Sequence, residues 1–344
     1  MPEATRIARL LGLNYSLKLI RARRTGGEEL IRGFFGTPAV IALLDVGLFD
    51  ELEQNGRVSV ESFAAQRHLD PEVLESLCTY LYAMKYLNRS DSAYVLSPSG
   101  RLLAQVLQGP FYMAAAYAPV FQNLNALLRG EKRYGRDVCK DIALSAKGSG
   151  AVGNVFTFPL VIDLIGKRGF RRVADLGCGD ASFLIALCQT TGGTGVGVDL
   201  SPEALADADR NIREAGLQAS IELICEDMFK VPDMAEQLAG IEAATIFFVL
   251  HEFLRDRERV VGFLRAFKES FPRTSLIVTD SIRHDRDELR RRPGPLMDFQ
   301  LTHELTGQKT LSREQWRALF RDGGFASVDE DYLRSVRMAV YTAS

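Results

Sequence analysis

The chain has 344 residues, of which 47% are apolar and 25% charged, and a formal net charge of -2. This length favours two domains, and this composition is typical of a soluble globular protein. The near-neutral charge argues against general affinity for nucleic acid or anionic membranes, and no apolar run approaches the roughly 18 residues that cross a bilayer. We therefore expect a cytoplasmic protein with neither nucleic acid nor a membrane as partner.

Five cysteines are scattered along the chain, without any Cys-x-x-Cys pair. An odd number without zinc-type spacing predicts free thiols in a reducing compartment. Cys178 stands inside a glycine-rich turn, where we interpret it as a small filler without chemistry of its own.

Residues 1–150 predict a mainly helical domain. Residues 5–24 mix apolar and basic side chains at helical spacing, which is typical of an amphipathic arm that a second copy of the chain buries. Three more helices within 38–87 and a hairpin at 88–98 resemble a winged helix. Residues 57–101 carry five Lys or Arg against five Asp or Glu. This balance leaves no electrostatic footprint for DNA, so we expect a homodimerisation domain.

Small residues between Gly148 and Gly153 predict a hinge to a second domain at 151–344. From Val173 onward, strand-like and helix-like segments alternate, which is typical of a parallel sheet covered by helices on both faces. Residues 325–344 contain two strand-like runs without a helix between them, so an antiparallel pair should close the sheet. The sequence therefore predicts an α/β fold behind a winged-helix-like domain.

A glycine-rich turn follows the first predicted strand of this second domain. In "VADLGCGDASF", Asp175 ends the strand, and Gly177 and Gly179 let the backbone turn sharply before a helix begins. Asp199 follows 24 positions after Asp175, at the end of the next strand. A carboxylate there can accept hydrogen bonds from both ribose hydroxyls, in dinucleotide enzymes as in other nucleoside-binding folds.

Three details favour S-adenosylmethionine over a dinucleotide. Ser182 replaces the third glycine of the dinucleotide fingerprint, Asp175 precedes the first glycine by two residues, and "CEDMF" follows the third strand. With these features the chain resembles the class I S-adenosylmethionine-dependent methyltransferases. The resemblance implies a Rossmann-like seven-stranded sheet that is parallel except for its C-terminal hairpin. It also implies cofactor contacts at Asp175, Gly177, Gly179, Asp199, Leu200, Asp227 and Met228.

The stretch "FFVLHEFLRD" puts His251 at the end of the fourth strand, next to the point where strand order reverses. A histidine with an ordinary pKa of about 6.5 suits a base that deprotonates a methyl acceptor, although a structural histidine is the alternative. Glu252 is a candidate to orient this ring or to cap the next helix. The front domain, the cofactor motifs and "LHEF" resemble small-molecule O-methyltransferases, in which a His-Asp pair provides the base; Glu252 replaces that Asp here.

A second histidine, His303, lies in the long segment after the fifth strand, which returns over the same face. Two neutral imidazoles that converge there predict a divalent-metal site, with water, substrate or Asp280 as a third ligand. Over nearly the whole chain, "YGRD" at Arg136, "HEF" at His251 and "THELTG" at His303 resemble the bacterial iron-dependent C-methyltransferases of phenylpyruvate and related 2-oxo acids. This resemblance implies that both histidines hold iron, that the 2-oxo acid chelates it, and that Arg136 grips the carboxylate.

The leading hypothesis is a homodimeric methyltransferase that acts, through a metal-chelated enolate, on a small acidic biosynthetic metabolite. The alternative is a metal-free small-molecule O-methyltransferase with His251 as general base. A winged-helix regulator that senses the cofactor and a dehydrogenase are further hypotheses, which the neutral 57–101 segment and the missing third glycine disfavour. His284, in a charged run broken by prolines, is expected in a solvated loop without a role.

Overall fold

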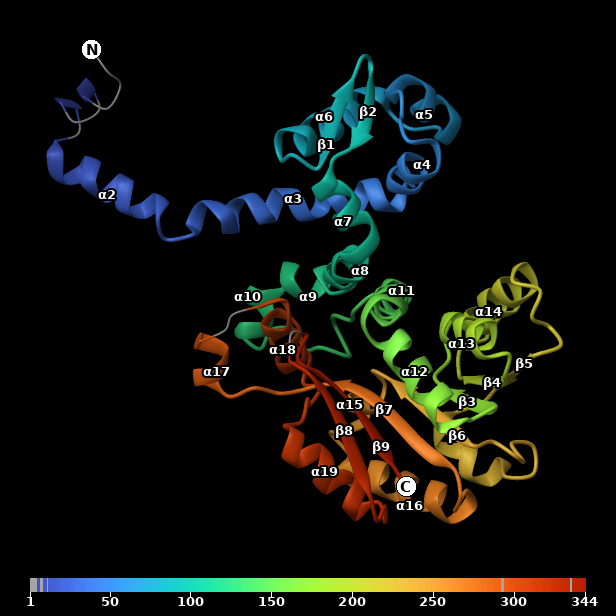
Figure 1. Ribbon diagram of the computed structural model, residues 1–344. Helices are drawn as coiled ribbons and strands as arrows, with labels where there is room; N and C mark the ends of the chain where they lie inside the picture. Colours follow the sequence, from blue (N-terminus) through green and yellow to red (C-terminus); the bar gives the residue numbers. More distant parts are fainter. Residues whose placement is uncertain (1–4, 7–8, 11, 292–293, 335) are drawn as a thin grey trace. The chain divides into compact units, whose positions relative to one another are not determined.

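The computed structural model describes residues 5–6, 9–10, 12–291, 294–334 and 336–344 (Figure 1). The chain divides into two compact units, Met1–Ala115 and Ala116–Ser344. Residues 116–150 therefore pack with the second unit. The functional division of the chain, with dimerisation in 1–150 and cofactor binding in 151–344, stays a prediction.

The first unit is a helical domain with one small hairpin. Its helices are α2 (Leu13–Arg23), α3 (Gly27–Asp45), α4 (Leu48–Asn55), α5 (Val60–Arg67), α6 (Pro71–Ala83), α7 (Pro98–Val106) and α8 (Gln108–Ala116). Strands β1 (Leu87–Ser90) and β2 (Ala93–Leu96) pair in antiparallel register. Asp70 caps α6, because its carboxylate accepts hydrogen bonds from the backbone N–H groups of Glu72 and Val73. The predicted helices followed by a hairpin are all present.

The second unit is built on a seven-stranded sheet, which confirms the predicted fold class. Its strands are β3 (Arg172–Leu176), β4 (Thr194–Asp199), β5 (Ile221–Cys225), β6 (Ala243–Phe247), β7 (Ser275–Ser281), β8 (Val328–Leu333) and β9 (Met338–Ala343). Their order is β5-β4-β3-β6-β7-β9-β8. The first five strands in this order are parallel, and β9 runs antiparallel to both of its neighbours.

Helices bury the apolar side chains of the sheet in two clusters. One cluster gathers residues of α12 (Phe158–Arg168), α13 (Ser182–Thr191) and α14 (Pro202–Glu214). The other gathers residues of η2 (Met228–Met234), α16 (Arg257–Ser270) and α19 (Arg313–Asp322), including the fully buried Trp316. Shorter elements complete the unit: α9 (Ala118–Gln122), α10 (Leu124–Leu128), α11 (Ile142–Val152), η1 (Gly153–Thr157), α15 (Leu250–Phe253), α17 (Arg286–Arg291) and α18 (Pro295–Thr306).

One helical stretch departs from the expectation that no apolar run is long enough to cross a membrane. Residues 142–168, which span α11, η1 and α12, meet the length and hydropathy for a membrane span, and 39% of the most apolar window is buried. Phe158, Val161 and Ile165 of this stretch pack into the core under the sheet. Core packing therefore accounts for part of its apolar character, and the cytoplasmic location stays a prediction.

The strand order reverses between β3 and β6, and this reversal positions the site. The chain moves outward from β3 to β4 and β5, then returns to the other side of β3 with β6 and β7. The carboxyl ends of β3 and β6 consequently lie side by side. The segments that follow these two strands lead away to opposite sides of the sheet, which leaves a gap in the backbone between them. In open parallel sheets this is where ligands bind.

Candidate functional site

The turn between β3 and α13 has the backbone geometry of a ligand-binding loop. Gly177 and Gly179 have positive φ angles of 84° and 54°. A Cβ atom on Gly177 would lie 3.0 Å from a methyl group of Val249, so a side chain here would force Val249 or the loop to shift. The N–H of Gly179 donates to the Asp199 carboxylate at 2.9 Å, which ties the loop to the end of β4.

Asp175 is a fully buried carboxyl group directly below this loop. The hydroxyl of Thr245 donates to its Oδ1 at 2.7 Å. Burial raises the pKa of Asp175 to about 7, and the nearby charges of Asp199 and Asp180 act in the same direction against the Thr245 hydrogen bond. A cation next to Asp175 would lower this pKa again, because it stabilises the ionised carboxylate.

The remaining predicted cofactor residues line the ends of the next two strands. The Asp199 carboxylate also accepts from the N–H of Ser201 at 2.9 Å, and Leu200 is largely exposed. After β5, the Asp227 carboxylate accepts from the N–H of Phe229 at 3.0 Å, and Met228 is buried. The structure thus brings all seven residues to the adjacent ends of β3, β4 and β5; their contacts with a cofactor stay a prediction.

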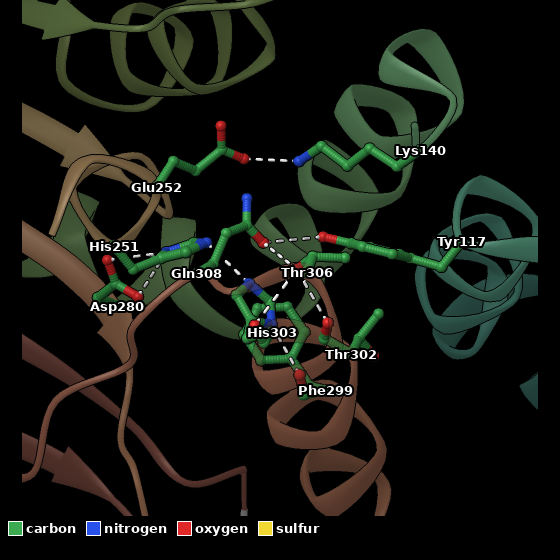
Figure 2. Close-up of polar contacts among 10 residues, drawn as sticks. All are labelled: Tyr117, Lys140, His251, Glu252, Asp280, Phe299, Thr302, His303, Thr306 and Gln308. Carbon is green, nitrogen blue, oxygen red and sulfur yellow. Dashed lines mark hydrogen bonds and ion pairs between the residues drawn. The ribbon is translucent and has the colours of Figure 1, made fainter. Parts of the chain in front are cut away.

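The two candidate metal ligands meet in the second unit. His251 lies on α15, shortly beyond the end of β6 rather than on the strand itself, and His303 lies on α18. Both rings are buried, and their Nε2 atoms are 2.9 Å apart (Figure 2). The guanidinium of Arg255 donates to the carbonyl of Thr306 at 3.1 Å. This contact joins the segment after His251 to the end of the helix that carries His303.

Hydrogen bonds on the far side of each ring determine where its proton sits. The Nδ1 of His251 is 2.9 Å from Asp280 Oδ1, and the Nδ1 of His303 is 2.7 Å from the carbonyl oxygen of Phe299. A carbonyl oxygen can only accept, and an ionised carboxylate can only accept, so both Nδ1 atoms donate. Two neutral rings would then bring the lone pairs of their Nε2 atoms together at one place beside both rings. A positive charge between the rings, either a proton or a metal ion, removes this repulsion.

The surroundings of the two rings give them different pKa values. Burial lowers the pKa of His251, but the charge and hydrogen bond of Asp280 outweigh it and raise the pKa above its ordinary value. Burial and the neighbouring His251 lower the pKa of His303 to about 2. Without a metal, the proton between the rings therefore belongs to His251, and His303 accepts a hydrogen bond from it.

The pair also fits a divalent metal ion. Imidazole nitrogens bind such ions at about 2.0–2.1 Å, so two ligands at a right angle stand about 3.0 Å apart. Hydrogen bonds from the second ring nitrogen to a carboxylate or a backbone carbonyl, as seen here, are typical of metal-binding histidines. The described residues include no group of three or more His, Cys, Asp or Glu side chains able to hold a metal. A third ligand from those residue types is therefore not present among them.

Comparisons with known proteins identify the domain in which these residues lie. Residues 173–269 match the family model described as a methyltransferase domain. The chain is 28% identical to the 2-ketoarginine methyltransferase of Streptomyces arginensis over 322 residues, which cover 90% of this chain and 89% of the relative. It is 24% identical to the indolepyruvate C-methyltransferase of Streptomyces griseus over 311 residues, 88% of this chain and 89% of that one. The chain carries a class I S-adenosylmethionine-dependent methyltransferase domain.

Solved structures support the fold of this methyltransferase. Human N-acetylserotonin methyltransferase, in complex with S-adenosylmethionine, superposes with a TM-score of 0.68 at 17% identity over 92% of this chain and 95% of its own. The mitomycin 7-O-methyltransferase gives a TM-score of 0.66 at 16% identity over 95% and 99%. These structures support the fold; the assignment as an S-adenosylmethionine-dependent methyltransferase rests on the methyltransferase domain at 173–269 and on the relatives of similar length.

The structure gives Asp280 and Glu252 of the methyltransferase different contacts from those predicted, which were metal binding for Asp280 and orientation of His251 or helix capping for Glu252. Asp280 holds His251 and is not available as a third metal ligand. Glu252 neither orients His251 nor caps the next helix, because its carboxylate binds the ammonium of Lys140 at 2.6 Å and Asp256 caps α16. The sequence signal for the His251–Asp280 pair is that His251 follows one predicted strand and Asp280 lies at the end of its neighbour.

Two further side chains join the cluster around the rings without a motif in the sequence to mark them. The hydroxyl of Tyr117 donates to Gln308 Oε1 at 3.4 Å, and its ring centre lies 6.3 Å from that of His303 (Figure 2). The hydroxyl of Thr306 lies 3.2 Å from the same Oε1, but its nearest acceptor is the carbonyl oxygen of Thr302, at 2.9 Å. The hydrogen bond from Tyr117 therefore orients the Gln308 carboxamide, whose oxygen can only accept.

Arg136 and His284 are not part of this cluster. The side chain of Arg136 is 66% exposed, and its guanidinium forms a bidentate contact with its neighbour Asp137. The structure therefore does not bring Arg136 together with the histidines. His284 is buried, and its Nδ1 lies 2.7 Å from Glu288, so the expectation of a solvated histidine was wrong.

Proposed function

We propose that this methyltransferase adds a methyl group to the carbon next to the keto group of a small 2-oxo acid, with His251 and His303 as ligands of a divalent metal ion. The observation that carries the proposal is the pair of buried Nε2 atoms 2.9 Å apart, which is the separation of two imidazole ligands at a right angle on one divalent ion. The names of the two Streptomyces relatives point in the same direction, because 2-ketoarginine and indolepyruvate are both 2-oxo acids.

The protein groups of the site divide the work of this reaction. Asp175 and Asp199 hold the methyl donor at the ends of β3 and β4, next to the segment that carries His251. Asp280 and the Phe299 carbonyl keep both Nε2 lone pairs directed at the metal position. A divalent ion bound there supplies a Lewis acid that makes the C–H bonds beside a keto group more acidic.

The alternative is a metal-free O-methyltransferase, with His251 as the base and Asp280 as its partner. A His-Asp pair at this position fits such a base. In the metal-free state, however, the Nε2 of His251 faces His303 and carries the shared proton. It then has no lone pair to accept a proton from a substrate hydroxyl, so this geometry favours the metal-dependent reaction.

Metal analysis combined with a substrate panel tests the proposal. The purified enzyme is expected to hold one divalent ion per chain, to methylate 2-oxo acids at carbon as seen by NMR of the product, and to lose activity with a chelator. His303→Ala should lose the ion and the activity while it still binds S-adenosylhomocysteine in a calorimetric titration. Activity on phenols that persists in chelator and in His303→Ala would overturn the proposal in favour of the metal-free O-methyltransferase.

We also propose that a second copy of the chain covers α2 and α3. These two helices expose an unusual number of large apolar side chains: Tyr15, Leu17, Leu30, Ile31, Phe34 and Phe35. Phe34 and Phe35 are 75% and 61% exposed and contact each other edge to face. Apolar exposure of this kind on neighbouring helices is typical of an interface.

A further inference from the structure

A 2-oxo acid that chelates the proposed metal ion through its keto oxygen and one carboxylate oxygen leaves its second carboxylate oxygen without a partner. A 2-oxo acid carries a carboxylate, and a buried carboxylate needs a cation or several hydrogen-bond donors. Arg136, the cation that the sequence suggested, is exposed and occupied by Asp137. The substrate carboxylate therefore needs another cation of the second unit, close to the two histidines.

Lys140 is such a cation. Its side chain is only 12% exposed, and its ammonium lies 5.6 Å from the centre of the Tyr117 ring. The same Tyr117 ring lies 6.3 Å, centre to centre, from that of His303, and Glu252, which accepts from Lys140, is the residue after His251. Figure 2 shows the Lys140–Glu252 ion pair, Tyr117 and the two histidines around the side chain of Gln308.

The contacts of Lys140 leave room for a second anion. An ammonium has three N–H donors. Within the described part of the chain, the Nζ atom has one hydrogen bond, to Glu252 at 2.6 Å. Glu252 is 37% exposed and on the rim of the cluster, so its carboxylate can turn to water when another anion arrives. A largely buried cation with a half-exposed counter-ion is suited to exchange one carboxylate for another.

We propose that Lys140 binds the carboxylate of the substrate, and that Glu252 is the counter-ion that the substrate displaces. This inference rests on the proposed function and deepens it, because it makes Lys140 the residue that selects acids over neutral ketones. Lys140 acts on binding: its contact with the carboxylate is made before and during methyl transfer alike. Its removal should therefore change KM more than kcat.

Two substitutions that should change KM in opposite directions test this role. Lys140→Met keeps the length of the side chain and removes the charge, and we expect it to raise KM for a 2-oxo acid about 10- to 100-fold, as for the loss of a charge-assisted hydrogen bond. The corresponding 2-oxo amide, which lacks the negative charge, should be methylated by Lys140→Met and by the wild type with the same KM. Glu252→Gln should lower KM for the acid severalfold, because it removes the competing carboxylate. An ion pair with only a structural role would make both variants worse.

Controls separate this inference from the function on which it rests. Lys167 pairs with Asp163 at the same 2.6 Å but is 73% exposed, so Lys167→Met should leave KM unchanged. Titration with S-adenosylhomocysteine checks that each variant is folded and binds the cofactor. The inference fails if Lys140→Met and Lys167→Met have the same KM, if acid and amide are affected equally, or if Arg136→Met shows the loss instead. If the wild type methylates no 2-oxo acid at all, the proposed function fails, and the role of Lys140 with it.

Discussion

Asp280, at the end of β7, holds the Nδ1 of His251 at 2.9 Å, although the two residues are 29 positions apart. The carboxylate is completely buried, and it fixes both the tautomer and the direction of the ring. It has this place because β6 and β7 are neighbouring parallel strands, whose carboxyl ends lie at the same edge of the sheet. The chemistry of His251 therefore depends on a residue of another strand.

Asp280→Asn is expected to weaken metal binding about 10- to 100-fold, as is usual for the loss of such a partner of a metal-binding histidine. The amide keeps the size of the side chain but loses the charge, so it can hold either tautomer of His251. Competition with a metal-binding dye measures the change, and unchanged cofactor affinity shows that the sheet is intact. Wild-type metal affinity in Asp280→Asn would contradict the assignment of His251 as a ligand.

Affinity for S-adenosylmethionine should rise with pH up to about 7 and then level off. The free enzyme holds a proton on Asp175 below its pKa of about 7, and the positive donor favours the ionised carboxylate, so binding at lower pH must release that proton. At pH 6 the affinity should be about tenfold lower than at pH 8. Calorimetric titrations in several buffers measure both the affinity and the proton release.

The same carboxyl group should make the cofactor-free enzyme less stable as pH rises. An aspartate has a pKa of about 3.9 in the unfolded chain, and the fold raises that of Asp175. The fold therefore favours the neutral group, and its contribution to stability is lost as pH rises from about 4 to about 7. Asp175→Asn keeps an acceptor for Thr245 and should abolish this loss and the pH dependence of cofactor binding. A variant with the wild-type pH profile would show that another group is responsible.

Charged substitutions on α3 should separate the proposed dimer. Phe34→Glu combined with Phe35→Glu puts two charges into the exposed apolar face, where desolvation in an interface would be costly. We expect a monomer by light scattering where the wild type is a dimer. Substitution of the exposed Leu128 by Glu, in the second unit, is the matched control and should leave the mass unchanged. A monomeric wild type would contradict the interface directly.

The fold was predictable because its signals are local. Alternating strands and helices, and the glycine turn at Gly177, depend on residues that are close in the sequence, and they led to the correct sheet. The site was predictable only in part. His251 and His303 could be paired because both follow strands at one edge, but the direction of each side chain depends on packing between distant elements.

Glu252 and Lys140 show why the rest could not be predicted. Glu252 is adjacent to His251 on a helical turn, and successive side chains on a helix point about 100° apart, so Glu252 faces a different neighbour from the ring. That neighbour is Lys140, 112 positions earlier, in an irregular segment between two helices without a periodic pattern. No spacing rule connects two such residues.

Gly177 allows a test of the cofactor loop itself. Its φ of 84° already disfavours any side chain, by about 1–2 kcal/mol, and a Cβ atom would also press against Val249 at 3.0 Å. Gly177→Ala should therefore lower thermal stability and strongly weaken S-adenosylmethionine binding, because the loop must move. Gly169 ends α12 with a φ of 74° and open space around its Cβ position, so Gly169→Ala has the same backbone strain without the contact. Gly169→Ala should lose only the stability that corresponds to that strain and should keep the wild-type cofactor affinity. If both variants lose affinity equally, the loss in Gly177→Ala does not come from a contact between the loop and the methyl donor.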